Sequence, residues 1–220
     1  MSVEITTLEQ PIDAMYLIHK ALRGEADRTV EQARSLEDGC SLQSFKLAFT
    51  AWATAIMYHA EKEVGTAMSK FVHESSRTAA HDPIERVKWA LLEKEDSEYM
   101  RLLEGVQDVM TVLEDDIGAT SVISRTKQHL YGQVIALRVA QEDHLETEEA
   151  MVLPLIRECL SPGCQLEVVG GLLIDCDADD QRWVIDWISQ HLTPKENELL
   201  LSLESRINQA QPVAQPQPVA

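Results

Sequence analysis

The chain has 220 residues and a formal net charge of −18, from 37 acidic and 19 basic side chains. Such an acidic surface repels phosphate backbones and anionic lipid, which argues against nucleic-acid binding and against attachment to a membrane surface. Hydrophobic residues make up 45% of the chain but aromatic residues only 5%, so aliphatic side chains supply the core, which favours helices packed on helices.

The lack of a recognisable targeting segment and the spacing of the cysteines favour a cytoplasmic location. No apolar run approaches the roughly 20 residues of a membrane span, and the N-terminal segment MSVEITTLEQ lacks the basic and apolar regions of a signal peptide. Cys40, Cys159, Cys164 and Cys176 form no Cys-x-x-Cys pair. We therefore expect reduced thiols in a cytoplasmic protein.

The first half of the chain predicts two long helices with a 3.6-residue apolar period. The first covers residues 11–36, and Pro11 suits its first turn. Asp38-Gly39 then breaks the pattern, and Ser41 can cap a second helix over residues 41–73.

Two further long helices follow a polar connector over residues 74–82. The third is predicted over residues 83–116, since proline is favoured in a first helical turn. After a turn at Ile117-Gly118, the fourth is predicted over residues 120–160, with a bend at Pro154.

The C-terminal part begins after the breaker Ser161-Pro162-Gly163. It contains an apolar segment at residues 166–174, a tryptophan-containing helix at residues 179–191 and a last helix opened by Thr193, whose capping box is completed by Glu196.

These elements predict an all-α protein, an up-and-down four-helix bundle with additional C-terminal helices. We assign residues 1–160 to the bundle and residues 161–208 to a C-terminal extension packed on it. Residues 209–220 belong to a terminal run rich in Pro, Gln and Ala, a composition typical of a disordered tail.

Each of the four long helices has an inward stripe stepping by three or four residues. Ionisable side chains interrupt every stripe. In chain order, the inward positions are Ile12, Met15, His19, Leu22, Ala26 and Val30; Phe45, Phe49, Trp52, Ile56, His59 and Glu63; Trp89, Leu92, Asp96, Tyr99, Leu103, Val106, Met110 and Leu113; and Leu130, Val134, Leu137, Gln141, His144, Glu148, Met151 and Leu155.

Three carboxylates and three histidines at core positions predict a metal site. His59 with Glu63, and His144 with Glu148, are spaced one helical turn apart, so each pair projects from one face. A buried carboxylate without a partner costs several kcal/mol. A multivalent cation offsets several such charges at once, and both imidazole and carboxylate are its ligands. The predicted ligands are His19, His59, Glu63, Asp96, His144 and Glu148.

Other interpretations compete with this one. A single core histidine such as His19 is more often a hydrogen-bonded core residue than a ligand, and a lone His-x-x-x-Glu pair commonly faces water. Asp96 lies in a very acidic stretch and could be one more solvated charge. The coincidence of four candidates in phase with four separate stripes favours the metal site.

The remaining histidines are predicted to be structural. His73 and His81 flank the polar connector, His129 lies one position off the stripe of the fourth helix, and His191 belongs to the C-terminal extension. His81 is a reserve ligand should Asp96 not serve.

The order of these residues resembles the hemerythrin-like, HHE cation-binding family. The resemblance covers about residues 12–160 and rests on the segments LIHKALR, YHAEKE and DHLETEE followed by VLP. It implies a four-helix bundle around a bridged di-iron centre. Carried over by position, His19, His59 and His144 would be terminal ligands, and Glu63 and Glu148 would bridge the two ions.

The third helix departs from the family pattern. Asp96 occupies the position at which the family commonly has a histidine. A carboxylate there makes the ligand set more anionic, which favours ferric iron and harder ions. Manganese is therefore an alternative occupant, and the resemblance to histidine-rich oxygen carriers weakens.

Three functions follow from these observations. The first is a sensor, store or carrier whose centre meets oxygen, nitric oxide, peroxide or iron. The second is a di-iron oxidoreductase that consumes peroxide or nitric oxide, and the third is a structural bundle without metal. Tyr99 and Gln141 are either hydrogen-bond partners around the centre or ordinary core residues. The sequence leaves both catalysis and oligomeric state open.

Overall fold

The computed structural model describes residues 4–37, 41–63, 100–111 and 124–210. Within these ranges the secondary structure is entirely helical and contains no strand, which confirms the predicted all-α class. None of the described helices combines the length and hydrophobicity that a membrane span requires.

The first two predicted helices are present. A short 3₁₀ turn, η1 (Pro11–Ala14), leads into α1 (Met15–Ser35). The next helix, α2 (Gln43–Lys62), begins where Ser41 Oγ accepts the backbone N–H of Gln43 at 3.2 Å. The predicted end of this helix near His73 lies outside the described residues.

Residues 100–111 are helical, as predicted for the third helix, whose predicted ends lie outside the described residues. They pack against α5 (Ser124–Thr147). Arg101 Nη1 donates to Asp143 Oδ2 at 2.8 Å, and a Cβ at Gly105 would lie 3.0 Å from the side chain of Leu137. The glycine thus lets the two helices approach closely.

Two of the three predicted inward positions in this segment are wrong by one residue, while Val106 packs partly buried against the core as predicted. Leu102 and Val109 are fully buried, whereas Leu103 is half-buried and Met110 is 40% exposed. The alternating apolar residues on both sides of the stripe made the two registers hard to separate by period alone.

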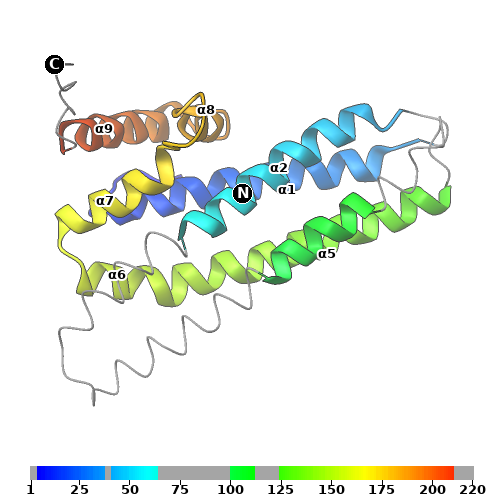
Figure 1. Ribbon diagram of the computed structural model, residues 1–220, viewed down its shortest axis with the longest axis horizontal. Coiled ribbons are helices and arrows are strands. Elements are labelled where there is room, and N and C mark those ends of the chain that lie inside the picture. Colours follow the sequence, from blue (N-terminus) through cyan, green and yellow to red (C-terminus); the bar gives the residue numbers. More distant parts are fainter. Residues whose placement is uncertain (1–3, 38–40, 64–99, 112–123, 211–220) are drawn as a thin grey trace, which may run out of the picture.

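The fourth predicted helix is present as one continuous rod in Figure 1, with a π turn in its course. After α5 comes η3 (Glu148–Val152), a π-helical turn, and then α6 (Leu153–Cys159). The N–H of Leu153 donates to the carbonyl of Glu148, five residues back. Pro154 has no N–H to donate and crowds the preceding turn, which favours the wider π geometry there.

The π turn corrects the predicted stripe beyond Glu148. Met151 is 44% exposed, whereas Val152 and Ile156, each one position later than predicted, are buried, as is Leu153. A π turn takes in one extra residue, so every side chain after it moves one position around the helix.

The C-terminal extension contains three helices, α7 (Pro162–Leu173), α8 (Trp183–Ser189) and α9 (Pro194–Ala210). Ser161 Oγ caps α7 by accepting the N–H of Cys164 at 3.3 Å. The predicted tryptophan helix is shorter than expected, because residues 179–182 form bends and turns.

The predicted capping box of the last helix is confirmed. Thr193 Oγ1 accepts the N–H of Glu196 at 3.3 Å, and Glu196 Oε2 accepts the N–H of Thr193 at 2.9 Å. Residues 209 and 210, assigned to the tail, are helical, and residues 211–220 lie outside the described part.

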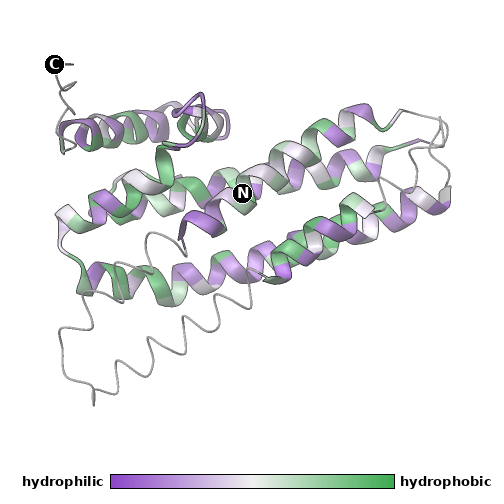
Figure 2. Ribbon diagram, in the orientation of Figure 1, coloured by the Kyte–Doolittle hydropathy of each residue, from purple (hydrophilic) through white to green (hydrophobic). Residues whose placement is uncertain are grey.

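Helix α1 is the centre of the arrangement. It packs against both α2 and α5, and α8 contacts it from the C-terminal extension (Figure 1). Polar and apolar residues alternate along the helices, as amphipathic packing requires (Figure 2). Trp52, Phe45 and Phe49 are at most 1% exposed, and each such burial contributes roughly 1.5–3 kcal/mol.

Candidate metal centre

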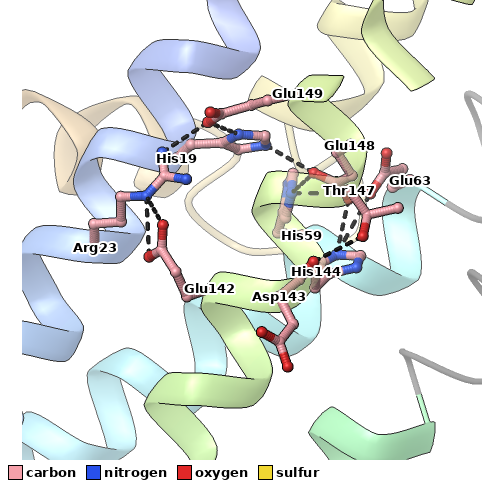
Figure 3. Close-up of polar contacts among 10 residues, drawn as sticks. All are labelled: His19, Arg23, His59, Glu63, Glu142, Asp143, His144, Thr147, Glu148 and Glu149. Carbon is pink, nitrogen blue, oxygen red and sulfur yellow. Dashed lines mark hydrogen bonds and ion pairs between the residues drawn. The ribbon is translucent and has the colours of Figure 1, made fainter. Parts of the chain in front are cut away.

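Five of the six predicted ligands come together between α1, α2 and the junction of α5 with η3. Figure 3 shows the three imidazoles and two carboxylates turned towards one another. None of these side chains is more than 3% exposed. The five residues are His19, His59, Glu63, His144 and Glu148, and we refer to them as the His/Glu cluster.

Glu148 is the centre of the His/Glu cluster. Its Oε2 lies 2.8 Å from His19 Nε2 and 3.5 Å from His59 Nε2. Its Oε1 lies 2.8 Å from His144 Nε2. The two oxygens of one carboxylate therefore face imidazoles from different helices, an arrangement that suits a carboxylate shared by two cations.

Glu63 closes the cluster from the end of α2. Its Oε2 lies 3.9 Å from His59 Nε2 and 3.7 Å from His144 Nε2. One ligand atom each from Glu63, His59, His144 and Glu148 lies within 4.8 Å of the others, all four residues being buried.

Local helix geometry explains this convergence. The spacing of four residues puts each histidine and its glutamate on one face of α2 or of the α5–η3 rod. Both glutamates also lie in π conformation: Glu148 begins η3, and Glu63 follows the last α residue of α2. π turns recur at functional sites because the wider turn re-aims its side chains.

The electrostatics of the cluster are those of buried imidazoles around an ionised carboxylate. Burial alone would raise the pKa of Glu148, but His144, Glu63 and His59 hold it well below its usual value. Burial lowers the pKa of His59, despite the attraction of Glu148. His59 is therefore neutral at pH 7, with a nitrogen lone pair available for a cation.

His19 behaves differently. Burial by itself would lower its pKa, but the hydrogen bonds and charges of Glu148 and Glu149 raise the pKa above its ordinary value. Without an ion, a proton on His19 Nε2 provides the positive charge that faces Glu148 Oε2. A metal cation would take the place of that proton and supply more charge at the same point.

The donor set fits a transition-metal ion. Imidazole nitrogen and carboxylate oxygen are the ligands of iron, manganese and zinc sites, and neither a thiolate nor a thioether belongs to the cluster. The sixth predicted ligand, Asp96, lies outside the described residues, as do Tyr99, His73 and the reserve ligand His81.

The other histidines lie away from the cluster. His129 is exposed, and its Nε2 lies 3.4 Å from Gln133 Nε2. His191 Nε2 contacts Glu25 Oε2 at 3.0 Å, between the C-terminal extension and α1.

Gln141 is buried one turn before His144, and its Oε1 accepts the indole N–H of Trp52 at 2.6 Å. This bond joins α2 to α5.

The sequence interpretation missed three residues that flank the cluster. Glu149 Oε1 lies 2.7 Å from His19 Nδ1, Arg23 Nη1 donates to the same oxygen at 2.7 Å, and Arg23 Nε donates to Glu142 at 2.9 Å (Figure 3). Glu142 and Glu149 both belong to the acidic segment QEDHLETEE. The spacing of a regular helix gives no reason to choose Glu149 from this segment as a partner of His19.

Comparisons with known proteins identify no relative of this chain. No family model, no curated protein and no solved structure matches the chain. The interpretation of the His/Glu cluster therefore depends on its geometry and chemistry.

Proposed function

We propose that the protein binds metal ions in the His/Glu cluster, as a hemerythrin-like protein with a non-haem di-iron centre. The observation that carries this proposal is Glu148, a fully buried carboxylate with three imidazoles within 3.5 Å. Multivalent cations stabilise such a concentration of buried donor groups, because one ion offsets several charges at once.

The fold supports the same proposal. We interpret α1, α2, the helix containing residues 100–111 and the α5–η3–α6 rod as an up-and-down four-helix bundle, with α7, α8 and α9 as a C-terminal cover. Bundles build di-iron carboxylate centres from inward-facing glutamates and histidines on several helices. The likeness to the hemerythrin-like family rests on the order of these residues in the chain.

Within this proposal the residues have separate roles. His19, His59 and His144 would hold the ions as neutral nitrogen donors, and Glu63 and Glu148 would lie between them. A bound pair of iron ions would supply reversible one-electron chemistry toward oxygen, nitric oxide or peroxide. Because none of the five side chains is more than 3% exposed, bulk water has little access to the donors.

Metal content after expression in iron-supplemented medium tests the proposal. We expect about two iron ions per chain by plasma mass spectrometry, with manganese as the alternative occupant. Folded, monodisperse protein that contains no transition metal, and takes up none from Fe²⁺ or Mn²⁺ solutions, would contradict the proposal and favour a structural bundle.

Turnover then separates a sensor, store or carrier from an oxidoreductase. The metal-loaded protein is mixed with excess peroxide, or with excess nitric oxide, and a reductant. Consumption of one equivalent per centre is expected for a binding protein, whereas sustained consumption would assign an enzyme.

A further inference from the structure

Glu149 shares one imidazole with its chain neighbour Glu148. Glu148 Oε2 lies 2.8 Å from His19 Nε2, and Glu149 Oε1 lies 2.7 Å from His19 Nδ1. The two carboxylates therefore hold opposite edges of the same ring. Glu148 lies inside the His/Glu cluster, while the side chain of Glu149 is 25% exposed at its rim.

Arg23 holds Glu149 in place. It lies four residues after His19 on α1, and its Nη1 donates to the same Glu149 oxygen that faces the imidazole, at 2.7 Å. The other side of the guanidinium, Nε, donates to Glu142 at 2.9 Å. The guanidinium limits the rotation of the Glu149 carboxylate, so that its oxygen stays directed at His19.

The contact with Glu149 selects which nitrogen of His19 carries the proton when the ring is neutral. A neutral imidazole carries its proton on one nitrogen only, and the partner of that nitrogen selects the tautomer. When a cation replaces the proton on Nε2 while Nδ1–H donates to Glu149, the lone pair lies on Nε2, beside Glu148. Carboxylates that accept the distal N–H of a ligating histidine also orient the ring and increase its basicity.

We propose that Glu149, clamped by Arg23, is a positioning residue that fixes the tautomer and the ring orientation of His19 for metal binding. This inference rests on the proposed function. Metal binding through His19 would therefore depend on Glu149, whereas binding through His144, whose Nε2 lies 2.8 Å from Glu148 Oε1, would depend on it much less.

Zinc(II) titration in competition with a chromogenic chelator measures the effect. Glu149→Ala removes the acceptor and is expected to weaken one of the two zinc affinities by roughly 10- to 100-fold, as for other outer-shell partners. Glu149→Gln keeps a neutral acceptor and is expected to recover part of that loss. Glu142→Ala is the matched control, because it removes an equal charge next to Arg23 but has no contact with His19.

Histidine ¹⁵N spectra of the zinc-loaded protein give a second readout that a merely structural role would not change. Wild type and Glu142→Ala are expected to show His19 as a single Nδ1–H tautomer, and Glu149→Ala a mixture or the opposite one. Helical circular dichroism of each variant checks that the fold is retained.

The outcomes separate this inference from the proposed function. Equal zinc affinities and equal His19 spectra for Glu149→Ala and Glu142→Ala would overturn the role of Glu149. Zinc binding by the wild-type protein would still support the proposed metal site in that case. Wild-type protein that takes up neither zinc nor iron would end both proposals.

Discussion

Two buried glutamates, Glu148 in the His/Glu cluster and Glu196 at the start of α9, have their charges offset by different kinds of partner. Both side chains are 0% exposed. Glu196 accepts from Lys20 Nζ at 2.6 Å and from the backbone N–H groups of Ile5 and Thr193 at 2.9 Å each. Glu148, within the described part of the chain, makes its ion pairs with imidazoles only.

The difference separates a structural carboxylate from a candidate ligand. A lysine and two amides satisfy Glu196 permanently, and they tie α9 and the N-terminal segment to α1. Imidazoles, in contrast, neutralise Glu148 only when protonated, and they become ligands when they lose the proton. Permanent donors produce a fixed joint between helices, whereas titratable donors leave a site that a cation can complete.

The largest expected effect comes from removing an imidazole of the cluster. His59→Ala and His144→Ala should each reduce iron per chain to near zero and weaken binding more than about 100-fold, beyond the loss of an outer-shell partner. His129→Ala is the control, since this ring is exposed and outside the cluster. Equal metal content in all three variants would refute the site assignment.

The opposite pattern is expected at the other glutamate. Glu196→Gln should leave iron content unchanged but lower the free energy of unfolding by on the order of 2–3 kcal/mol, because Lys20 and two amides lose a charged acceptor. Urea unfolding of the metal-free protein measures this loss. The exposed Glu198 provides the control as Glu198→Gln. Equal stability of the two variants would contradict a stabilising role for Glu196.

Acid should erase the contribution of Glu196. Burial by itself would raise the pKa of this carboxyl, but the hydrogen bonds from Lys20, Ile5 and Thr193 lower the pKa to about 2. The ionised group therefore stabilises the fold fully above its unfolded pKa of about 4.3, and that stability is lost as pH falls towards 2.

The measurement is the difference in unfolding free energy between wild type and Glu196→Gln at several pH values. The difference should be constant from pH 7 to 5.5 and should shrink below pH 4. A difference that grows on acidification would contradict the lowered pKa of Glu196 in the folded protein.

The smallest expected effect concerns the sixth predicted ligand. Asp96→Asn should weaken iron binding by about tenfold, since one of several anionic donors is lost, while the neighbouring Glu95→Gln should not. The buried residues Leu102 and Val109 each lie one position before the predicted Leu103 and Met110, so this pair of variants is informative. A larger loss in Glu95→Gln would move the ligand by one residue, in line with that offset.

Much of the fold and of the cluster could be predicted because both depend on local period. The inward positions of α1 and α2 follow from apolar residues three and four apart, and His19, His59 and Glu63 were found as interruptions of those stripes. Thr193 and Glu196 were recognised in the same way, from a spacing that has one common structural meaning.

One error arose in residues 100–111, where apolar residues offered two registers, and the other arose where a π turn changed the period. Pro154 and the π turn at Glu148 shifted the buried positions to Val152 and Ile156, which a constant 3.6-residue period cannot anticipate.

The sequence by itself determined that the protein is helical and that His19, His59, Glu63, His144 and Glu148 face the core, since a residue's face follows from its spacing along a helix. Only the tertiary structure decided that Glu148 lies among three imidazoles and that Arg23 and Glu149 support one of them. Apart from the one-turn pair His144 and Glu148, these contacts join residues more than 80 positions apart. Helix packing and the π turn set such distances, and neither is encoded in the spacing of residues along one segment.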